Sequence, residues 1–157
     1  MIYSFVIRTL NKNFMREYHV PSTFSLYDFN RFIASELDFD DSQQSVFFLL
    51  DANGKKIESY SLFDMGYGAM DAVTLEDLNS KGMTNLLYTF DFFNNRSLYI
   101  EFQGETDALP RVSYPVVAQS KGDAPGQFIE KFEDDINSEI VIDNDDSDEY
   151  GLDEYDE

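Results

Sequence analysis

The chain of 157 residues predicts an α+β protein with a mostly antiparallel sheet packed against one main helix. Its first half has a β-grasp-like order of elements, and an acidic tail follows at the C-terminus. Three observations carry this prediction: paired runs with strand periodicity, one long stretch with helical periodicity, and a sharp separation of charge along the chain. The 15 Phe and 10 Tyr residues, with no Trp, indicate a core of large aromatic rings.

The clearest predicted element is a hairpin at 86–102. Two aromatic-rich runs flank Asn94-Asn95, which are residues that favour a tight turn. Alternation along the two runs predicts one apolar face, made of Leu86, Tyr88, Phe90, Phe92, Leu98, Ile100 and Phe102. The hairpin therefore anchors the sheet in this prediction.

The N-terminal half predicts two strands followed by a helix. Alternation predicts strands at 2–10 and 14–20, and Pro21 ends the second. A helix is expected from Ser25 to Leu37 or Asp38, because apolar residues recur at helical spacing and Ser25 and Asp28 have capping-box spacing. This order, followed by two further strands, is the basis of the β-grasp-like description.

The remaining elements are shorter. Strands are expected at 45–50 and 55–60, and a short helix capped by Thr74 is expected at 74–79. We expect an edge strand at 112–117, since Pro115 cannot donate to a ladder. Loop or coil is predicted for 61–70, 104–110 and 120–127.

Charge divides the chain into a body at 1–132 and a tail at 133–157. The tail holds thirteen acidic residues and no basic ones, out of a total net charge of −20. Its acidic and scattered apolar residues are typical of a disordered segment that binds a partner. A tail that only increases solubility is an equal alternative, and 137–142 could instead add a strand to the sheet.

Composition excludes several classes of function. The eleven basic residues are scattered, which argues against direct binding to nucleic acid or to an anionic membrane. The absence of Cys excludes disulfides and thiolate metal sites. No cofactor is expected. The N-terminus does not match a secretory signal and no run is long enough to span a membrane, so we expect a cytoplasmic protein.

Several motifs together resemble the plasmid pRiA4b ORF-three-like family. Tyr18-His19-Val20-Pro21 leads into Phe24-Ser25-Leu26-Tyr27-Asp28-Phe29, and Val73-Thr74-Leu75-Glu76-Asp77-Leu78 matches its short helix. Tyr88-Thr89-Phe90-Asp91-Phe92 and Tyr114-Pro115 match its aromatic strand and its Tyr-Pro motif. The resemblance covers about 2–127 and implies an α+β fold with no established activity.

The chain is a divergent member by this resemblance. Phe93, Asn94, Asn95 and Arg96 stand where the family usually has Gly, acidic residues and Trp, and Leu98 stands near its common histidine. The family's Cys residues after the Tyr-Pro motif are absent from 118–127. If those Cys bind metal in other members, this chain lacks that capacity.

Candidate site residues are few. Asp91, Arg96, Asn94 and Asn95 are the candidate binding residues of the body, although Asp91 could simply face solvent or Arg96. We expect a structural role for His19 and no phosphate loop at 66–69. In the tail, the candidate residues are Asp143, Asp145, Asp146, Asp148, Glu149 and Glu154. Their spacing partly matches a calcium loop, but Asp148 stands where the sharp turn needs Gly, so no metal site is predicted.

Two functions fit these observations. The first is a non-enzymatic protein-interaction domain whose acidic tail engages a basic protein, for example one that handles nucleic acid. The alternative is a domain that binds a small molecule or a divalent cation, with or without enzymatic activity, with a site between 61–70 and the Asn94-Asn95 turn. A rigid DNA mimic ranks below both, because a disordered tail does not hold carboxylates at fixed spacing.

Overall fold

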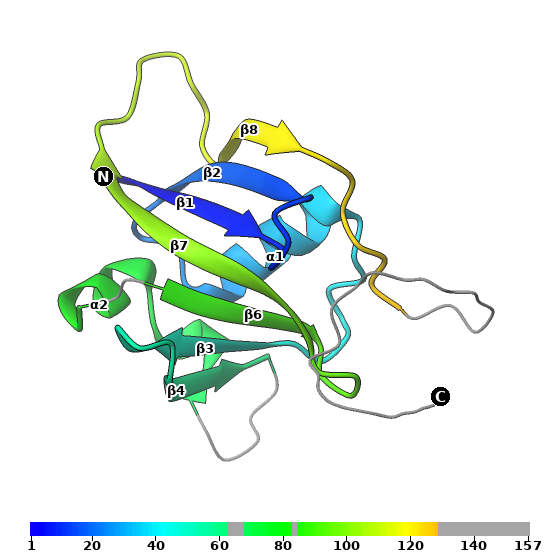
Figure 1. The fold of residues 1–157 in the computed structure, drawn as a ribbon. Helices are drawn as coiled ribbons and strands as arrows, with labels where there is room; N and C mark the ends of the chain where they lie inside the picture. The colour runs from blue at the N-terminus through cyan, green and yellow to red at the C-terminus, as the bar shows by residue number, and fades with distance from the viewer. Residues whose placement is uncertain (63–67, 83–84, 129–157) are drawn as a thin grey trace.

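Eight strands form one sheet in the computed structural model, which describes residues 1–62, 68–82 and 85–128 (Figure 1). The strand order is β5-β4-β3-β6-β7-β1-β2-β8. Neighbouring strands are antiparallel except for β4 and β5, which are parallel. The sheet is thus mixed but mostly antiparallel, which confirms the predicted α+β class.

The elements follow one another as β1 (Ile2–Arg8), β2 (Met15–Pro21), α1 (Leu26–Leu37), β3 (Val46–Leu50), β4 (Lys56–Ser61), β5 (Gly68–Ala69), the 3₁₀ turn η1 (Met70–Ala72), α2 (Leu75–Ser80), β6 (Asn85–Asp91), β7 (Arg96–Thr106) and β8 (Val116–Lys121). The first five appear in the predicted order of two strands, one helix and two further strands. Strand β7 lies beside β1, on the side opposite β2, and runs antiparallel to β1. Neither α1 nor α2 is long and apolar enough to cross a membrane, and this finding covers the described residues alone.

Both helices begin at the predicted capping boxes. Ser25 Oγ accepts a hydrogen bond from the backbone N–H of Asp28, and the Asp28 carboxylate accepts one from the backbone of Ser25. Thr74 and Asp77 make the same reciprocal pair at the start of α2. Two orphan backbone donors are satisfied at each N-terminus, so these local signals fix where each helix starts.

The core lies between one face of the sheet and the helices. Phe29 of α1 lies against Phe5 of β1 and Phe47 of β3, with ring centroids 5.0 and 5.8 Å apart. Leu75 and Leu78 of α2 belong to the same buried cluster. Figure 1 shows α1 behind the sheet, on the side that these rings cover. The opposite face carries no helix within the described ranges.

Three boundary predictions in the body are wrong. β7 continues to Thr106, into the segment predicted as loop, and β8 lies at Val116–Lys121 instead of 112–117. Pro115 therefore precedes the edge strand. The residues of β8 are mostly polar or exposed, so hydrophobic alternation does not reveal the strand, which is held by backbone pairing with β2. In the predicted loop at 61–70, Gly68 and Ala69 form β5, and 63–67 lie outside the described residues.

The hairpin at 86–102 is present as β6 and β7, but Phe92 does not join its apolar face. A register shift between Thr89 and Asp91 interrupts the alternation, and β6 ends at Asp91. Phe92 is consequently 39% exposed and Phe93 is 88% exposed, while Phe90 remains buried. The end of the hairpin is thus a separate structural feature from its buried strands.

Candidate functional site

The turn between β6 and β7 is closed by Asp91. One carboxylate oxygen, Oδ1, accepts hydrogen bonds from the backbone N–H and the side-chain Nδ2 of Asn94, at 3.3 and 3.1 Å. The other, Oδ2, accepts from Asn94 Nδ2 at 3.0 Å and from Arg96 Nη1 at 3.1 Å. Asn95 takes a positive φ of 54°, a conformation that Asn tolerates better than most residues. All four predicted binding residues of the body therefore belong to one turn.

Arg96 connects this turn to the end of the described chain. Its side chain is 3% exposed, and its guanidinium lies over the Phe90 ring with 4.9 Å between CZ and the ring centroid. Nη2 donates to the backbone carbonyl of Gly126 at 2.6 Å, and Nη1 donates to that of Gln127 at 3.2 Å. Burial lowers the pKa of Arg96 below its ordinary value, and the nearby Asp91 carboxylate opposes that shift. The cation thus holds two carbonyls that lie thirty or more residues further along the chain.

Gln127 is fixed from its other side by the segment after α1. Its Oε1 accepts from the backbone N–H of Asp40 at 2.7 Å, and its Nε2 donates to the carbonyl of Asp40 at 3.0 Å. We call Asp91, Arg96, Gln127 and Asp40 the tail anchor. Four residues separate Phe128, the last described residue, from the acidic segment 133–157 in the sequence. The six candidate acids of the tail lie outside the described residues.

Exposed aromatic residues directly follow two residues of the tail anchor in the sequence, Asp91 and Gln127. Phe92 and Phe93 are in contact, with centroids 5.9 Å apart and the rings nearly perpendicular. Phe128, which directly follows Gln127, is 61% exposed. We call Phe92, Phe93 and Phe128 the aromatic tip. Sequence reasoning missed the aromatic tip, although two consecutive Phe residues beside an Asn-Asn turn were a signal for it.

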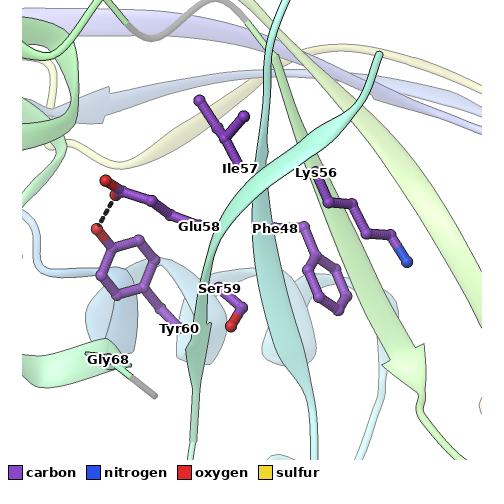
Figure 2. Close-up of a pocket in the computed structure, with 7 residues that line it drawn as sticks. All are labelled: Phe48, Lys56, Ile57, Glu58, Ser59, Tyr60 and Gly68. Carbon is purple, nitrogen blue, oxygen red and sulfur yellow. Dashed lines mark hydrogen bonds between the residues drawn. The ribbon is translucent and has the colours of Figure 1, made fainter.

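A shallow groove of about 510 Å³ lies across β3, β4 and β5. It is lined by Phe48, Lys56, Ile57, Glu58, Ser59, Tyr60 and Gly68. Figure 2 shows Glu58 and Tyr60 on one side of β4, and Lys56 with Phe48 on the other. The Lys56 ammonium lies 4.2 Å from the centroid of the Phe48 ring.

Polar groups at one wall of this groove are joined by hydrogen bonds. The Tyr60 hydroxyl donates to Glu58, and Lys81 Nζ lies 3.2 Å from both Glu58 Oε1 and the Tyr60 hydroxyl. The hydrogen bond from Tyr60 lowers the pKa of Glu58, and burial followed by the Glu58 contact raises the pKa of Tyr60. The groove thus offers a carboxylate, a hydroxyl and an ammonium. Asp91 and Arg96, the polar groups expected in an alternative binding site, do not line it.

His19 does not join either site. Its Nε2 lies 2.7 Å from Glu17 Oε2, and Ser4 Oγ donates to the same oxygen at 3.3 Å. Both His19 and Ser4 therefore contact the carboxylate and not each other as a base and a nucleophile would. Within the part of the chain that the structure describes, no three His, Cys, Asp or Glu residues are arranged to hold a metal ion. Of the predicted loop at 66–69, Gly68 lines the groove.

The fold and these features define an α+β protein with one sheet, one main helix and a described chain whose last residues are held against the body by Arg96 and Asp40. A scan against family models matches residues 4–150 to the plasmid pRiA4b ORF-3-like protein family. The chain belongs to this family, which confirms the resemblance of its sequence motifs. The matched span includes part of the acidic segment.

A solved structure has a similar fold. The crystal structure of MM3350, a protein of unknown function from Methanosarcina mazei Go1, superimposes with a TM-score of 0.64 and 17% sequence identity. The similarity covers 76% of this chain and 68% of that chain. At this identity the comparison concerns the fold alone. No curated protein matches the chain.

Proposed function

We propose that this protein is a non-enzymatic interaction domain whose acidic segment, 133–157, engages a basic surface on another protein. The tail anchor is the observation that carries the proposal. A buried Arg96 and a doubly bonded Gln127 hold the chain just before the segment begins. A segment that only increased solubility would not require such a fixed exit.

Charge defines the kind of partner. The segment has thirteen carboxylates and no cation, and residues 1–132 are also net negative. Clustered Lys and Arg on a partner would offset the repulsion among these carboxylates and increase the rate of association. A protein that handles nucleic acid offers such a basic groove when its nucleic acid is absent. The cytoplasm is the proposed location, and the β-grasp comparison for the first half is kept as an analogy of element order.

The test compares the full chain with a chain ending at residue 132 in pull-downs from the native host. A second variant keeps the full length but replaces the thirteen tail acids with Asn or Gln. We expect basic proteins to be captured by the full chain and lost from both variants. Capture by the full chain should fall steeply as salt rises, because the contacts are ionic.

Unchanged thermal unfolding of both variants is the control for an intact body. Capture of the same proteins by all three chains would refute a role for the acidic segment. Loss on truncation without loss on neutralisation would show that apolar residues of the segment, and not its charges, make the contact.

The groove supports a second candidate, a domain that binds a small molecule or a divalent cation, with or without enzymatic activity. Its support is the carboxylate of Glu58 and the hydroxyl of Tyr60, which line a groove of about 510 Å³ and both contact the Lys81 ammonium. A bound ligand must raise the unfolding temperature by mass action. A screen of divalent cations and nucleotides that raises it for the native chain, and not for Glu58→Gln, would support this function.

A further inference from the structure

We propose that the aromatic tip, Phe92, Phe93 and Phe128, is a contact surface for a protein that has an apolar patch flanked by Lys and Arg. This inference rests on the proposed function, because the acidic segment supplies the electrostatic part of the same contact. It adds a defined place on the body where the partner is recognised by shape and not by charge alone.

The first argument is that the tip is both exposed and held in place. Phe93 is 88% exposed, and its ring contacts that of Phe92. The turn that presents them is closed by four hydrogen bonds to the Asp91 carboxylate, from Asn94 and Arg96. Little conformational freedom of the backbone remains to be lost on binding. Large aromatic side chains on rigid supports are typical of the residues that dominate protein interfaces.

The second argument is the position of the β6–β7 turn beside the last described residues, which precede the acidic segment in the sequence. Arg96 of this turn bonds to the carbonyls of Gly126 and Gln127, and Phe128 is the next residue. Figure 1 shows the β6–β7 turn and the last described residues at the same end of the sheet. A partner that binds the acidic segment is therefore brought to the aromatic tip. The partner's surface must carry an apolar centre with basic residues around it. A typical interface has an apolar core and a polar rim, and the charges of that rim must be complementary to this acidic chain.

Another exposed apolar residue provides a matched control. Leu109 is 62% exposed and lies in the loop between β7 and β8, at the opposite end of the sheet (Figure 1). Leu109 is exposed like the rings of the tip, but it lies far from the tail anchor. A surface that is merely sticky would respond equally to changes at either place.

The test uses the full chain and two synthetic peptides of equal charge. One is an amphipathic helix of Leu and Lys, and the other has every Leu replaced by Ser. The variants are Phe92→Ser with Phe93→Ser, Leu109→Ser, and the chain with its thirteen tail acids neutralised. Affinity is measured by fluorescence anisotropy at constant salt, and thermal unfolding confirms that each variant is folded. If the double variant does not fold, Phe93→Ser alone replaces it, since that side chain is almost fully exposed.

The native chain should bind the Leu/Lys peptide about tenfold more tightly than the Ser/Lys peptide, a difference within the reach of one or two buried rings. In the double variant, the ratio of the two affinities should fall by at least about fivefold, and the affinity for the Ser/Lys peptide should stay the same. Leu109→Ser should keep both affinities.

Equal effects of the two sites, or no effect of the double variant, would overturn the proposal. A double variant that binds more tightly would also overturn it, because the rings would then be covered by the tail's own apolar residues. Self-association that depends on Phe92 and Phe93 would assign the tip to a second copy instead. The proposed function fails separately, if neutralising the tail leaves the affinity for the Ser/Lys peptide unchanged.

Discussion

Two cations of this protein, Arg96 and Lys81, each pair with a carboxylate, but their surroundings differ completely. Arg96 is 3% exposed and bonds to Asp91 and to two backbone carbonyls, at Gly126 and Gln127. Lys81 is 46% exposed and lies near Glu58 and the Tyr60 hydroxyl at the rim of a groove. The first pair holds distant parts of the chain together, and the second lies on a surface that water reaches.

This difference shows where ionic contacts matter for folding. A buried guanidinium without partners would be very costly, so each of its acceptors is needed once it is buried. An exposed ammonium exchanges its carboxylate for water at little cost, and salt screens the contact. Arg96 is thus a structural residue that holds Gly126 and Gln127 in place, whereas the groups around Lys81 can exchange partners with water.

The largest expected effect comes from Arg96→Met. This change keeps the approximate volume of the side chain, but it leaves the half-buried Asp91 carboxylate without its cation and two carbonyls without their donor. We expect a loss of about 3–5 kcal/mol in the free energy of unfolding, measured with urea. Lys81→Met, the matched surface change, should not move the midpoint measurably. Equal losses for the two variants would contradict the distinction between the pairs.

Arg96→Lys sharpens the same comparison. A single ammonium cannot reproduce the planar fork that reaches both carbonyls and the carboxylate. We therefore expect stability between that of the native chain and Arg96→Met. Native stability in the Lys variant would show that charge alone, without the fork geometry, holds the tail anchor.

The second expected effect is a loss of stability at alkaline pH. Tyr18 is fully buried, and burial together with its 2.6 Å hydrogen bond to Glu36 raises its pKa far above the ordinary value near 10. The contribution of the protonated Tyr18 hydroxyl to the free energy of unfolding is complete below about pH 10, the ordinary pKa of tyrosine in the unfolded chain. This contribution is lost as the pH rises toward the pKa of Tyr18 in the folded protein. Urea unfolding between pH 8 and 11 should show the decline.

Tyr60 is the counterpart of Tyr18 at the groove, because its hydroxyl also donates to a glutamate, Glu58. Tyr18→Phe should flatten the alkaline decline more than Tyr60→Phe does, because the hydrogen bond from Lys81 opposes the rise in the pKa of Tyr60. A decline that is unchanged in Tyr18→Phe would show that other buried tyrosines, such as Tyr88, account for it. Burial also raises the pKa of Tyr88.

The sequence predicted those parts of the fold whose signals are local. Ser25 and Thr74 are capping residues with an acidic partner three positions later, and both helices start there. The aromatic runs of β6 and β7 alternate because one face packs on a core. Such patterns depend on neighbours in the chain and can be read without the fold.

The candidate site was predicted only in part, because its geometry depends on distant residues. Pairing of Asp91 with Arg96 was one of the alternatives, and the structure shows it, while the role of the two residues in binding stays a prediction. No local pattern links Arg96 to Gly126 or Gln127, which lie thirty residues away in a polar stretch. The edge strand β8 was misplaced for the same reason, since its pairing with β2 leaves no alternation in its sequence.

The smallest expected effect comes from Gln127→Ala. The amide of Gln127 exchanges two hydrogen bonds with the backbone of Asp40, and both lie near solvent. Their loss should lower the free energy of unfolding by about 1 kcal/mol. Gln119→Ala, on the exposed edge of β8, is the control and should have no effect.

Hydrogen exchange separates the local from the global consequence of Gln127→Ala. If Gln127 helps to hold the chain where the acidic segment begins, the backbone amide of Asp40 should exchange faster in the variant, because it loses its acceptor. Amides of β1 and β7 in the centre of the sheet should change only as far as the global stability does. Unchanged exchange at Asp40 would mean that Arg96 alone fixes the exit of the tail, and the tail anchor would then reduce to its buried ion pair.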